Sequence, residues 1–128
     1  MTRILIADDC DVVRRGIKHL LRQHAGWEVC GEAVDGQEAV EKARQLSPDL
    51  VLLDYSMPVL NGIEAARQIR QSQPNTRFVL CSMYMDGQLA ALARKVGITS
   101  LLSKSNVGQI LKSVEAGLHC ESFAESSI

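Results

Sequence analysis

The sequence lacks any long uninterrupted apolar run. No stretch approaches the roughly 20 apolar residues that a membrane-spanning helix needs. The first residues lead directly into an apolar segment at Ile4, without the basic stretch, long apolar region and cleavage site of a signal peptide. We therefore expect a cytoplasmic protein that has no membrane contact.

Basic clusters and paired cysteines are also missing. The chain has 14 Lys and Arg residues against 15 Asp and Glu residues, and they form no basic patch. A chain of this kind is not expected to bind nucleic acid by itself. Its four cysteines are scattered and form no C-x-x-C pair, which argues against a cysteine metal site or a disulfide framework. They are Cys10, Cys30, Cys81 and Cys120. Cys81 lies in an apolar run, which predicts a reduced core residue.

What the sequence does contain is a regular alternation of strand and helix patterns. Its 128 residues suit one domain with a sizeable core. Runs of apolar residues predict strands at 3–7, 27–33, 50–53, 78–81 and 100–103. Apolar residues at helical spacing predict helices within 13–24, 36–46, 62–69, 89–96 and 107–118, with Asn106 as the N-cap of the last.

Five such units predict an α/β fold with a parallel sheet covered by helices on both faces. Residues 27–33 alternate between apolar and polar, which is typical of an edge strand. The expected architecture is therefore a flavodoxin-like, doubly wound (βα)5 fold with five parallel strands in the order 2-1-3-4-5. We expect one domain at 1–120, followed at 121–128 by a polar tail or the start of a linker to an output domain.

Polar residues follow four of the predicted strands. Asp8 and Asp9 follow the first, Asp54 the third, Ser82 the fourth and Lys104 the fifth. A doubly wound sheet binds its ligands beyond the carboxyl ends of its strands, where the strand order reverses. Here that point lies between the first and third strands, so the fold should gather three carboxylates with a hydroxyl and an ammonium.

Such a cluster favours a divalent cation. Close carboxylates repel one another unless one is protonated or a cation is bound, and Mg2+ prefers a few carboxylates plus waters. A carboxylate such as Asp54 can accept a phosphoryl group as an acyl phosphate. Lys104 and Ser82 would supply a positive charge and a hydrogen bond, which is most of what phosphoryl transfer requires.

At these positions the sequence resembles the receiver domains of bacterial response regulators, over nearly its whole length. The resemblance is carried by Ile4–Asp9, by the motif D-x-x-M-P-x-x-x-G from Asp54 to Gly62, by Ser82 and by Lys104. It implies that Asp54 is the phosphoacceptor and that Ser82 and Lys104 hold the phosphoryl oxygens. It further implies that Mg2+ is bound by Asp9, Asp54 and the backbone carbonyl of Ser56, and by Asp8 largely through water.

The segments Ser82–Tyr84 and Val114–His119 resemble the LuxR/NarL-type subgroup, whose members carry a C-terminal helix-turn-helix. This resemblance implies a sensor histidine kinase as partner and a transcriptional output. DNA would be bound only through a domain that this chain lacks, and a homodimer is left open. The chain would be a switch rather than an enzyme, catalysing only its own phosphorylation and dephosphorylation.

Two positions depart from the receiver pattern. Leu101 stands where receivers usually have an aromatic residue, so the signal would travel by loop and helix movement without an aromatic rotamer switch. Ser105 stands where a proline with a cis bond often follows the lysine. These departures leave open a stand-alone or phosphorylation-independent receiver that acts as a docking module. Tyr84 has two open interpretations, shielding a phosphoryl group from water or covering a groove.

Two further classes fit the sequence less well. A phosphatase of the haloacid-dehalogenase type would need a second acid two residues after Asp54, where Ser56 stands. A flavodoxin-like cofactor binder would need a phosphate-binding loop after the first strand, where Asp8 and Asp9 would repel phosphate. Taken singly, each site residue also has an ordinary role, such as N-cap, loop hydroxyl or solvated charge. Together, at four strand ends, they favour the receiver.

Overall fold

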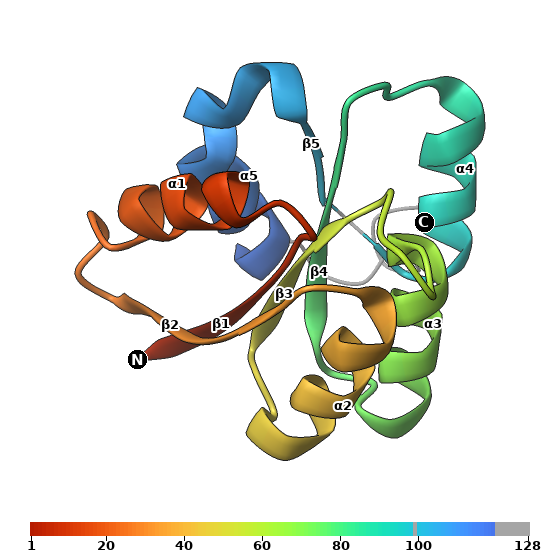
Figure 1. Ribbon diagram of the computed structural model, residues 1–128, viewed down its shortest axis with the longest axis horizontal. Helices are drawn as coiled ribbons and strands as arrows, with labels where there is room; N and C mark the ends of the chain where they lie inside the picture. The colour runs from red at the N-terminus through yellow and green to blue at the C-terminus, as the bar shows by residue number, and fades with distance from the viewer. Residues whose placement is uncertain (99, 120–128) are drawn as a thin grey trace.

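The computed structural model, which describes residues 1–98 and 100–119, contains one five-stranded parallel sheet (Figure 1). The strand order is β2-β1-β3-β4-β5, which confirms the predicted fold. The strands are β1 (Thr2–Ala7), β2 (Trp27–Ala33), β3 (Leu50–Asp54), β4 (Arg77–Ser82) and β5 (Ser100–Ser103). The strand with the alternating pattern, β2, lies at an edge as predicted.

Helices cover both faces of the sheet (Figure 1). They are α1 (Asp11–Leu21), α2 (Gly36–Leu46), α3 (Gly62–Ser72), α4 (Gly87–Lys95) and α5 (Ile110–His119), with a short 3-10 stretch, η1 (Lys104–Gln109), before α5. In β3, Val51 and Leu53 pack in the core beneath α2, α3 and α4, while Leu50 and Leu52 pack in the core beneath α1 and α5. Burial on both faces explains why the central strands are continuously apolar.

Side-chain N-caps fix where three of the helices begin. The carboxylate of Asp35 accepts a hydrogen bond from the Glu38 backbone N–H at 2.7 Å, which starts α2. Asn61 caps α3 and Asp86 caps α4 in the same way, at 2.9 and 2.8 Å. Such caps satisfy backbone donors that have no partner within the helix. The start of α3 closes the loop that follows Asp54.

The predicted end of the first helix was wrong. We expected a helix that reaches residue 24, but α1 ends at Leu21. The backbone N–H groups of Gln23 and His24 bond the carbonyls of Leu20 and Leu21 in tight turns. His24 instead stacks on the Trp27 ring, with 3.8 Å between the ring centroids. Stacking at the start of β2 therefore replaces a further helical turn.

The predicted start of the last helix was also wrong. Asn106 does not cap α5, which begins at Ile110; it lies inside η1 with non-helical dihedrals of φ −135° and ψ 51°. The N-cap acting here is Ser103, whose hydroxyl accepts from the Ser105 backbone N–H. Because the chain is already capped at Ser103, it turns immediately after β5.

The remaining expectations concern cysteines and the chain end. Cys81 is buried, as predicted, and burial raises the pKa of its thiol to about 12. Cys10 and Cys30 are also free thiols. Cys120 and the predicted tail at 121–128 lie outside the described residues, so the predicted domain division stays a prediction. Within the described part of the chain, no helix has both the length and the apolar character needed to span a bilayer.

Candidate functional site

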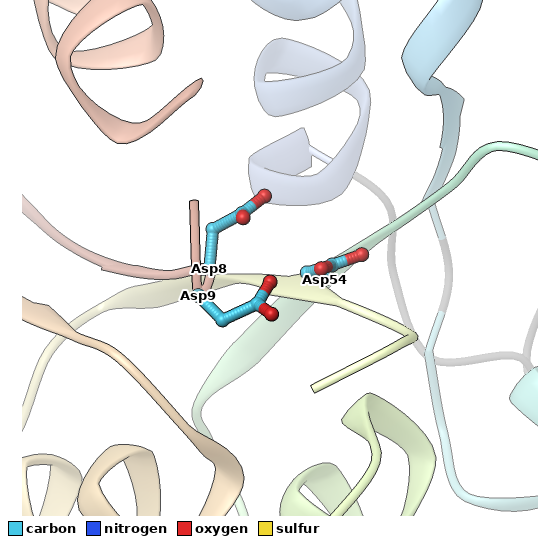
Figure 2. A group of neighbouring side chains, drawn as sticks. All are labelled: Asp8, Asp9 and Asp54. Atoms are coloured by element: carbon cyan, nitrogen blue, oxygen red, sulfur yellow. The ribbon is translucent and has the colours of Figure 1, made fainter. Parts of the chain in front are cut away.

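Three carboxylates meet at the carboxyl edge of the sheet. Asp8 and Asp9 follow β1, and Asp54 is the last residue of the neighbouring β3 (Figure 2). One carboxylate oxygen of each lies within 4.8 Å of those of the other two. Asp8 and Asp54 are 2% and 3% exposed, whereas Asp9 is open to solvent. The predicted acidic cluster is therefore confirmed, and it forms a group that could hold a metal ion.

Lys104 reaches the acidic cluster from the end of β5, the edge strand opposite β2. It follows β5 directly, and its Nζ lies 2.9 Å from Asp8 Oδ2 and 3.1 Å from Asp54 Oδ2. One ammonium bridges the two buried carboxylates but cannot balance all three. The site therefore retains negative charge, which favours binding of a cation.

Burial and their mutual contact shift the pKa values of Asp54 and Lys104. Burial raises the pKa of Asp54, repulsion by Asp8 raises it further, and the hydrogen bond from Lys104 opposes both. Burial alone would lower the pKa of Lys104, but its hydrogen bonds to Asp8 and Asp54 outweigh that effect and raise it. Lys104 is thus held as an ammonium. A further cation near Asp54 would stabilise the charged form of its carboxylate.

The loop after Asp54 has a tightly defined backbone. Tyr55 N–H donates to the Cys81 carbonyl at 2.8 Å, and Gly62 N–H donates to the Tyr55 carbonyl at 2.9 Å. A Cβ at Gly62 would lie 2.5 Å from the Asp54 carbonyl oxygen. Val59 adopts φ +72°, which is rare for a β-branched residue. The glycine of the D-x-x-M-P-x-x-x-G motif is therefore required by the close approach of α3 to Asp54.

Two predicted site residues are placed nearby without contacting a carboxylate through their side chains. Ser82 ends β4 and is 6% exposed, and its hydroxyl donates to the Tyr84 backbone carbonyl at 3.0 Å. Ser56 N–H donates to Asp54 Oδ1 at 3.3 Å. Their predicted roles toward a phosphoryl group and a metal stay predictions. Tyr84 is 85% exposed and so covers no groove in this structure.

The residue after Lys104 has an ordinary backbone. Every peptide bond among the described residues is trans, including the one that joins Lys104 to Ser105. Leu101, which replaces the usual aromatic residue, is half-buried on β5 and packs against the core under α2, α3 and α4. Neither departure disturbs the contacts of Lys104 with the acids.

One residue at this edge of the sheet was missed by the sequence analysis. Arg14 on α1 is buried, and its guanidinium donates to the backbone carbonyl of Asp8 at 2.7 Å. A signal was present, because Arg14 precedes the buried Ile17 and Leu21 by three and seven residues and so shares their helix face. A charged residue in register with an apolar stripe indicates a buried, paired charge.

Comparison with known proteins identifies the family. The model of the response regulator receiver domain matches residues 4–115. This chain belongs to that family. The receiver is a module of two-component signalling, as the motif and the strand-end residues predicted.

Individual relatives agree with this assignment. The receiver is 39% identical over 115 residues to the transcriptional regulatory protein LnrK of Bacillus subtilis, covering 89% of this chain and 52% of LnrK. It is 39% identical over 102 residues to the chemotaxis protein CheY of Thermotoga maritima, covering 80% and 84% of the two chains. A two-component response regulator of the LuxR family from Aurantimonas sp. superposes with a TM-score of 0.89 at 32% identity, covering 95% and 89%. The chain thus spans about half the length of LnrK but most of the length of CheY.

Proposed function

We propose that this receiver accepts a phosphoryl group on Asp54 from a sensor histidine kinase, with Mg2+ bound beside it. The observation that carries the proposal is Lys104, whose ammonium reaches both Asp8 and Asp54 across the acidic cluster. A nucleophilic carboxylate, a paired cation and an unbalanced negative charge are the parts that phosphoryl transfer to an aspartate needs.

The donor set of the cluster suits Mg2+. Asp9 and Asp54 would bind the ion directly together with the Ser56 carbonyl, and Asp8 would act largely through water. Oxygen ligands, few in number and with one acid open to solvent, match an ion that keeps several waters. When bound, the ion would neutralise charge on the carboxylates and on the incoming phosphoryl group.

The transfer itself is a simple exchange of bonds. A carboxylate oxygen of Asp54 attacks the phosphorus of a phosphohistidine, an O–P bond forms and the P–N bond breaks. The electron pair of that bond leaves with the imidazole, which takes up a proton. Lys104 lies 3.1 Å from Asp54 Oδ2, so its ammonium would pair with a negatively charged phosphoryl oxygen. Ser82 would leave the Tyr84 backbone to donate to another oxygen.

The output that we propose is transcriptional, through a C-terminal helix-turn-helix domain. LnrK, which is described as a transcriptional regulator, is about twice the length of the matched region. The receiver would act in the cytoplasm as a switch rather than an enzyme with a free substrate. An alternative is a stand-alone docking module, favoured by the match over 84% of CheY. The gene sequence beyond codon 128 distinguishes the two.

Covalent labelling tests the phosphoacceptor. Incubation with a small acyl-phosphate donor and Mg2+, followed by peptide mass spectrometry, should place the phosphoryl group on Asp54 alone. Asp54→Asn keeps the size of the side chain and removes the nucleophile, so this variant should not be labelled. Equal labelling of the wild type and the variant would disprove the assignment.

A titration tests the metal site separately. Addition of Mg2+ should raise the thermal stability of the wild-type receiver, because the ion binds the folded cluster and not the unfolded chain. Asp9→Ala removes the solvent-open ligand and should lose most of this response. If both proteins respond alike at millimolar Mg2+, the ion binds elsewhere.

A further inference from the structure

Arg14 is a buried cation that lies outside the cluster of Asp8, Asp9 and Asp54. It lies in the first turn of α1, on the face that also carries Ile17 and Leu21, and is 9% exposed. Burial of a guanidinium is unfavourable unless its N–H donors are bonded and its charge is paired. The partners of Arg14 therefore show what its burial achieves.

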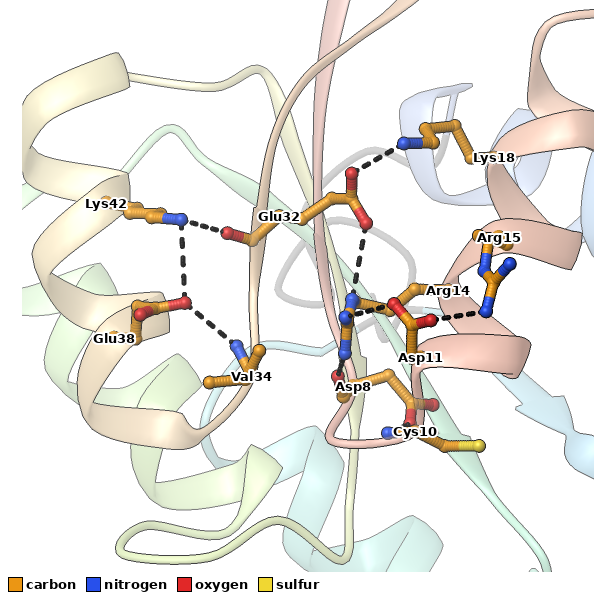
Figure 3. Close-up of polar contacts among 10 residues, drawn as sticks. All are labelled: Asp8, Cys10, Asp11, Arg14, Arg15, Lys18, Glu32, Val34, Glu38 and Lys42. Atoms are coloured by element: carbon orange, nitrogen blue, oxygen red, sulfur yellow. Dashed lines mark hydrogen bonds and ion pairs between the residues drawn. The ribbon is translucent and has the colours of Figure 1, made fainter.

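The guanidinium ties together three segments of the chain (Figure 3). Its Nη1 donates to the Asp8 backbone carbonyl at 2.7 Å, at the end of β1. Its Nη2 donates to Asp11 Oδ1 at 2.8 Å in the first turn of α1, and its Nε donates to Glu32 Oε1 at 3.2 Å on β2. Lys18 holds the other oxygen of Glu32 at 2.7 Å.

The bond to the Asp8 carbonyl acts on the metal-binding segment. That carbonyl and the N–H of Asp9 belong to one planar peptide unit, so fixing the carbonyl orients the unit from which Asp9 projects. The same segment is fixed at two further points. Asp8 N–H donates to the Ala33 carbonyl at 3.1 Å, and Cys10 N–H donates to Asp8 Oδ1 at 2.9 Å.

The charge of Arg14 is satisfied locally. Asp11 and Glu32 pair with it, so its role toward the cluster is geometric and does not depend on neutralising the Asp8 carboxylate. We propose that Arg14 is a positioning residue of the metal site, which holds the Asp8–Asp9 peptide so that both carboxylates are aligned before the ion binds. This inference rests on the proposed function, because it concerns the same Mg2+ site.

The chain offers a matched control one residue away. Arg15 pairs with the same Asp11, but from the solvent side of α1, with 67% of its side chain exposed. Arg14→Gln removes the buried guanidinium, Arg14→Lys keeps its charge without the planar fork of donors, and Arg15→Gln removes an equal charge from the surface. Glu32→Gln weakens the anchor of Arg14 on β2 without touching β1.

The test measures Mg2+ binding to the unphosphorylated receiver by calorimetry. Arg14→Gln and Arg14→Lys should weaken the affinity by about tenfold, the effect typical of losing a group that orients a metal ligand. Arg15→Gln should change it by less than about twofold, as expected of an exposed pair. If Arg14→Gln fails to fold, Arg14→Lys and Glu32→Gln carry the test, with Glu32→Gln expected between the two results.

A second readout separates positioning from general stabilisation. The rate of Asp54 labelling should need about tenfold more Mg2+ for half-saturation in the Arg14 variants, yet approach the wild-type rate when Mg2+ saturates. A lower maximal rate with unchanged half-saturation, or wild-type affinity in folded Arg14 variants, would overturn the proposal for Arg14 alone. If the wild type neither binds Mg2+ nor is labelled on Asp54, the proposed function fails, and the role of Arg14 fails with it.

Discussion

At the scale of single residues, two basic side chains act on the acidic cluster in different ways. Lys104 bridges Asp8 and Asp54 directly, and its position depends on where β5 ends. Arg14 contacts no carboxylate of the cluster in the same way, but holds the backbone from which two of them project. The first contact sets the charge of the site and the second sets its shape.

The lowered pKa of Glu32 makes the stability of the receiver depend on pH. The hydrogen bond from Lys18 outweighs the effect of burial and holds the pKa of Glu32 below its ordinary value, with further help from Arg14. A carboxyl whose pKa is lower in the folded state stabilises the protein above its unfolded pKa and loses that contribution as the pH falls through its folded pKa.

We therefore expect Glu32→Gln to lower the free energy of unfolding by about 0.5–1 kcal/mol at neutral pH. The difference from wild type should shrink as the pH falls below about 4.3, the ordinary glutamate pKa, and vanish once Glu32 is protonated in both states. Urea unfolding between neutral and acidic pH measures this. Glu41→Gln on the exposed surface of α2 is the control, and a constant difference at all pH values would contradict the prediction.

At the scale of elements, the start of α3 determines the shape of the Asp54 loop. Gly62 is the first residue of α3, and its Cα approaches the Asp54 backbone so closely that a side chain has no room. The backbone of Asp54 and the first turn of α3 are therefore in close contact, so a displacement of one would press on the other.

We expect Gly62→Ala to destabilise the receiver by about 1–3 kcal/mol, the usual cost of inserting a methyl group into a packed site. It should also slow the labelling of Asp54, because the Asp54 carbonyl must move to make room. Gly87→Ala at the start of α4 is the matched control, since its added Cβ meets nothing within 4 Å. Unfolding and labelling measured on both variants test this, and similar behaviour of the two would refute the steric argument.

The same elements show how far the sequence alone could predict the fold and the site. The bounds of β2 and β5 and the starts of α2 and α3 were predicted, because periodicity and turn signals are local properties. The start of α5 was not, since Asn106 is a good N-cap by type, yet Ser103 had already turned the chain.

Some residues of the candidate site could likewise be predicted from the sequence, and others could not. The gathering of Asp8, Asp9, Asp54 and Lys104 followed from strand order, which places strand ends side by side. Arg14 was overlooked because its partners come from β1 and β2, and only tertiary packing brings those strands against α1. Whether Ser82 turns toward a phosphoryl oxygen depends on a second conformation, which strand order does not determine.

At the scale of the whole molecule, the proposed switch would carry a change at Asp54 to α5, beyond the other end of the β5–η1 segment. Lys104 is the direct connection, because it contacts Asp54 and begins the η1 stretch that leads into α5. A two-state element is biased only by contacts that differ between its states. A phosphoryl group that attracts Lys104 would provide such a difference.

We expect Lys104→Ala to uncouple the switch while largely preserving the fold. Hydrogen exchange across residues 86–118, with and without beryllofluoride as a phosphoryl mimic, should change in wild type and change by less than about half as much in the variant. Lys112→Ala on the exposed side of α5 removes the same charge away from the site and should behave as wild type. An equal response in Lys104→Ala would assign the connection to other residues.

The position of Trp27 determines which signal an optical experiment on this receiver reports. Trp27 is the only tryptophan in the chain and pairs with Thr2, at the start of β1, whereas the acids follow the other end of that strand. Six strand residues at roughly 3.3 Å each lie between the indole and the acidic cluster. Intrinsic tryptophan emission should therefore follow unfolding of the core and the His24 stack, and remain silent during phosphorylation. A fluorescence assay of switching in this protein needs a second fluorophore placed near Lys104.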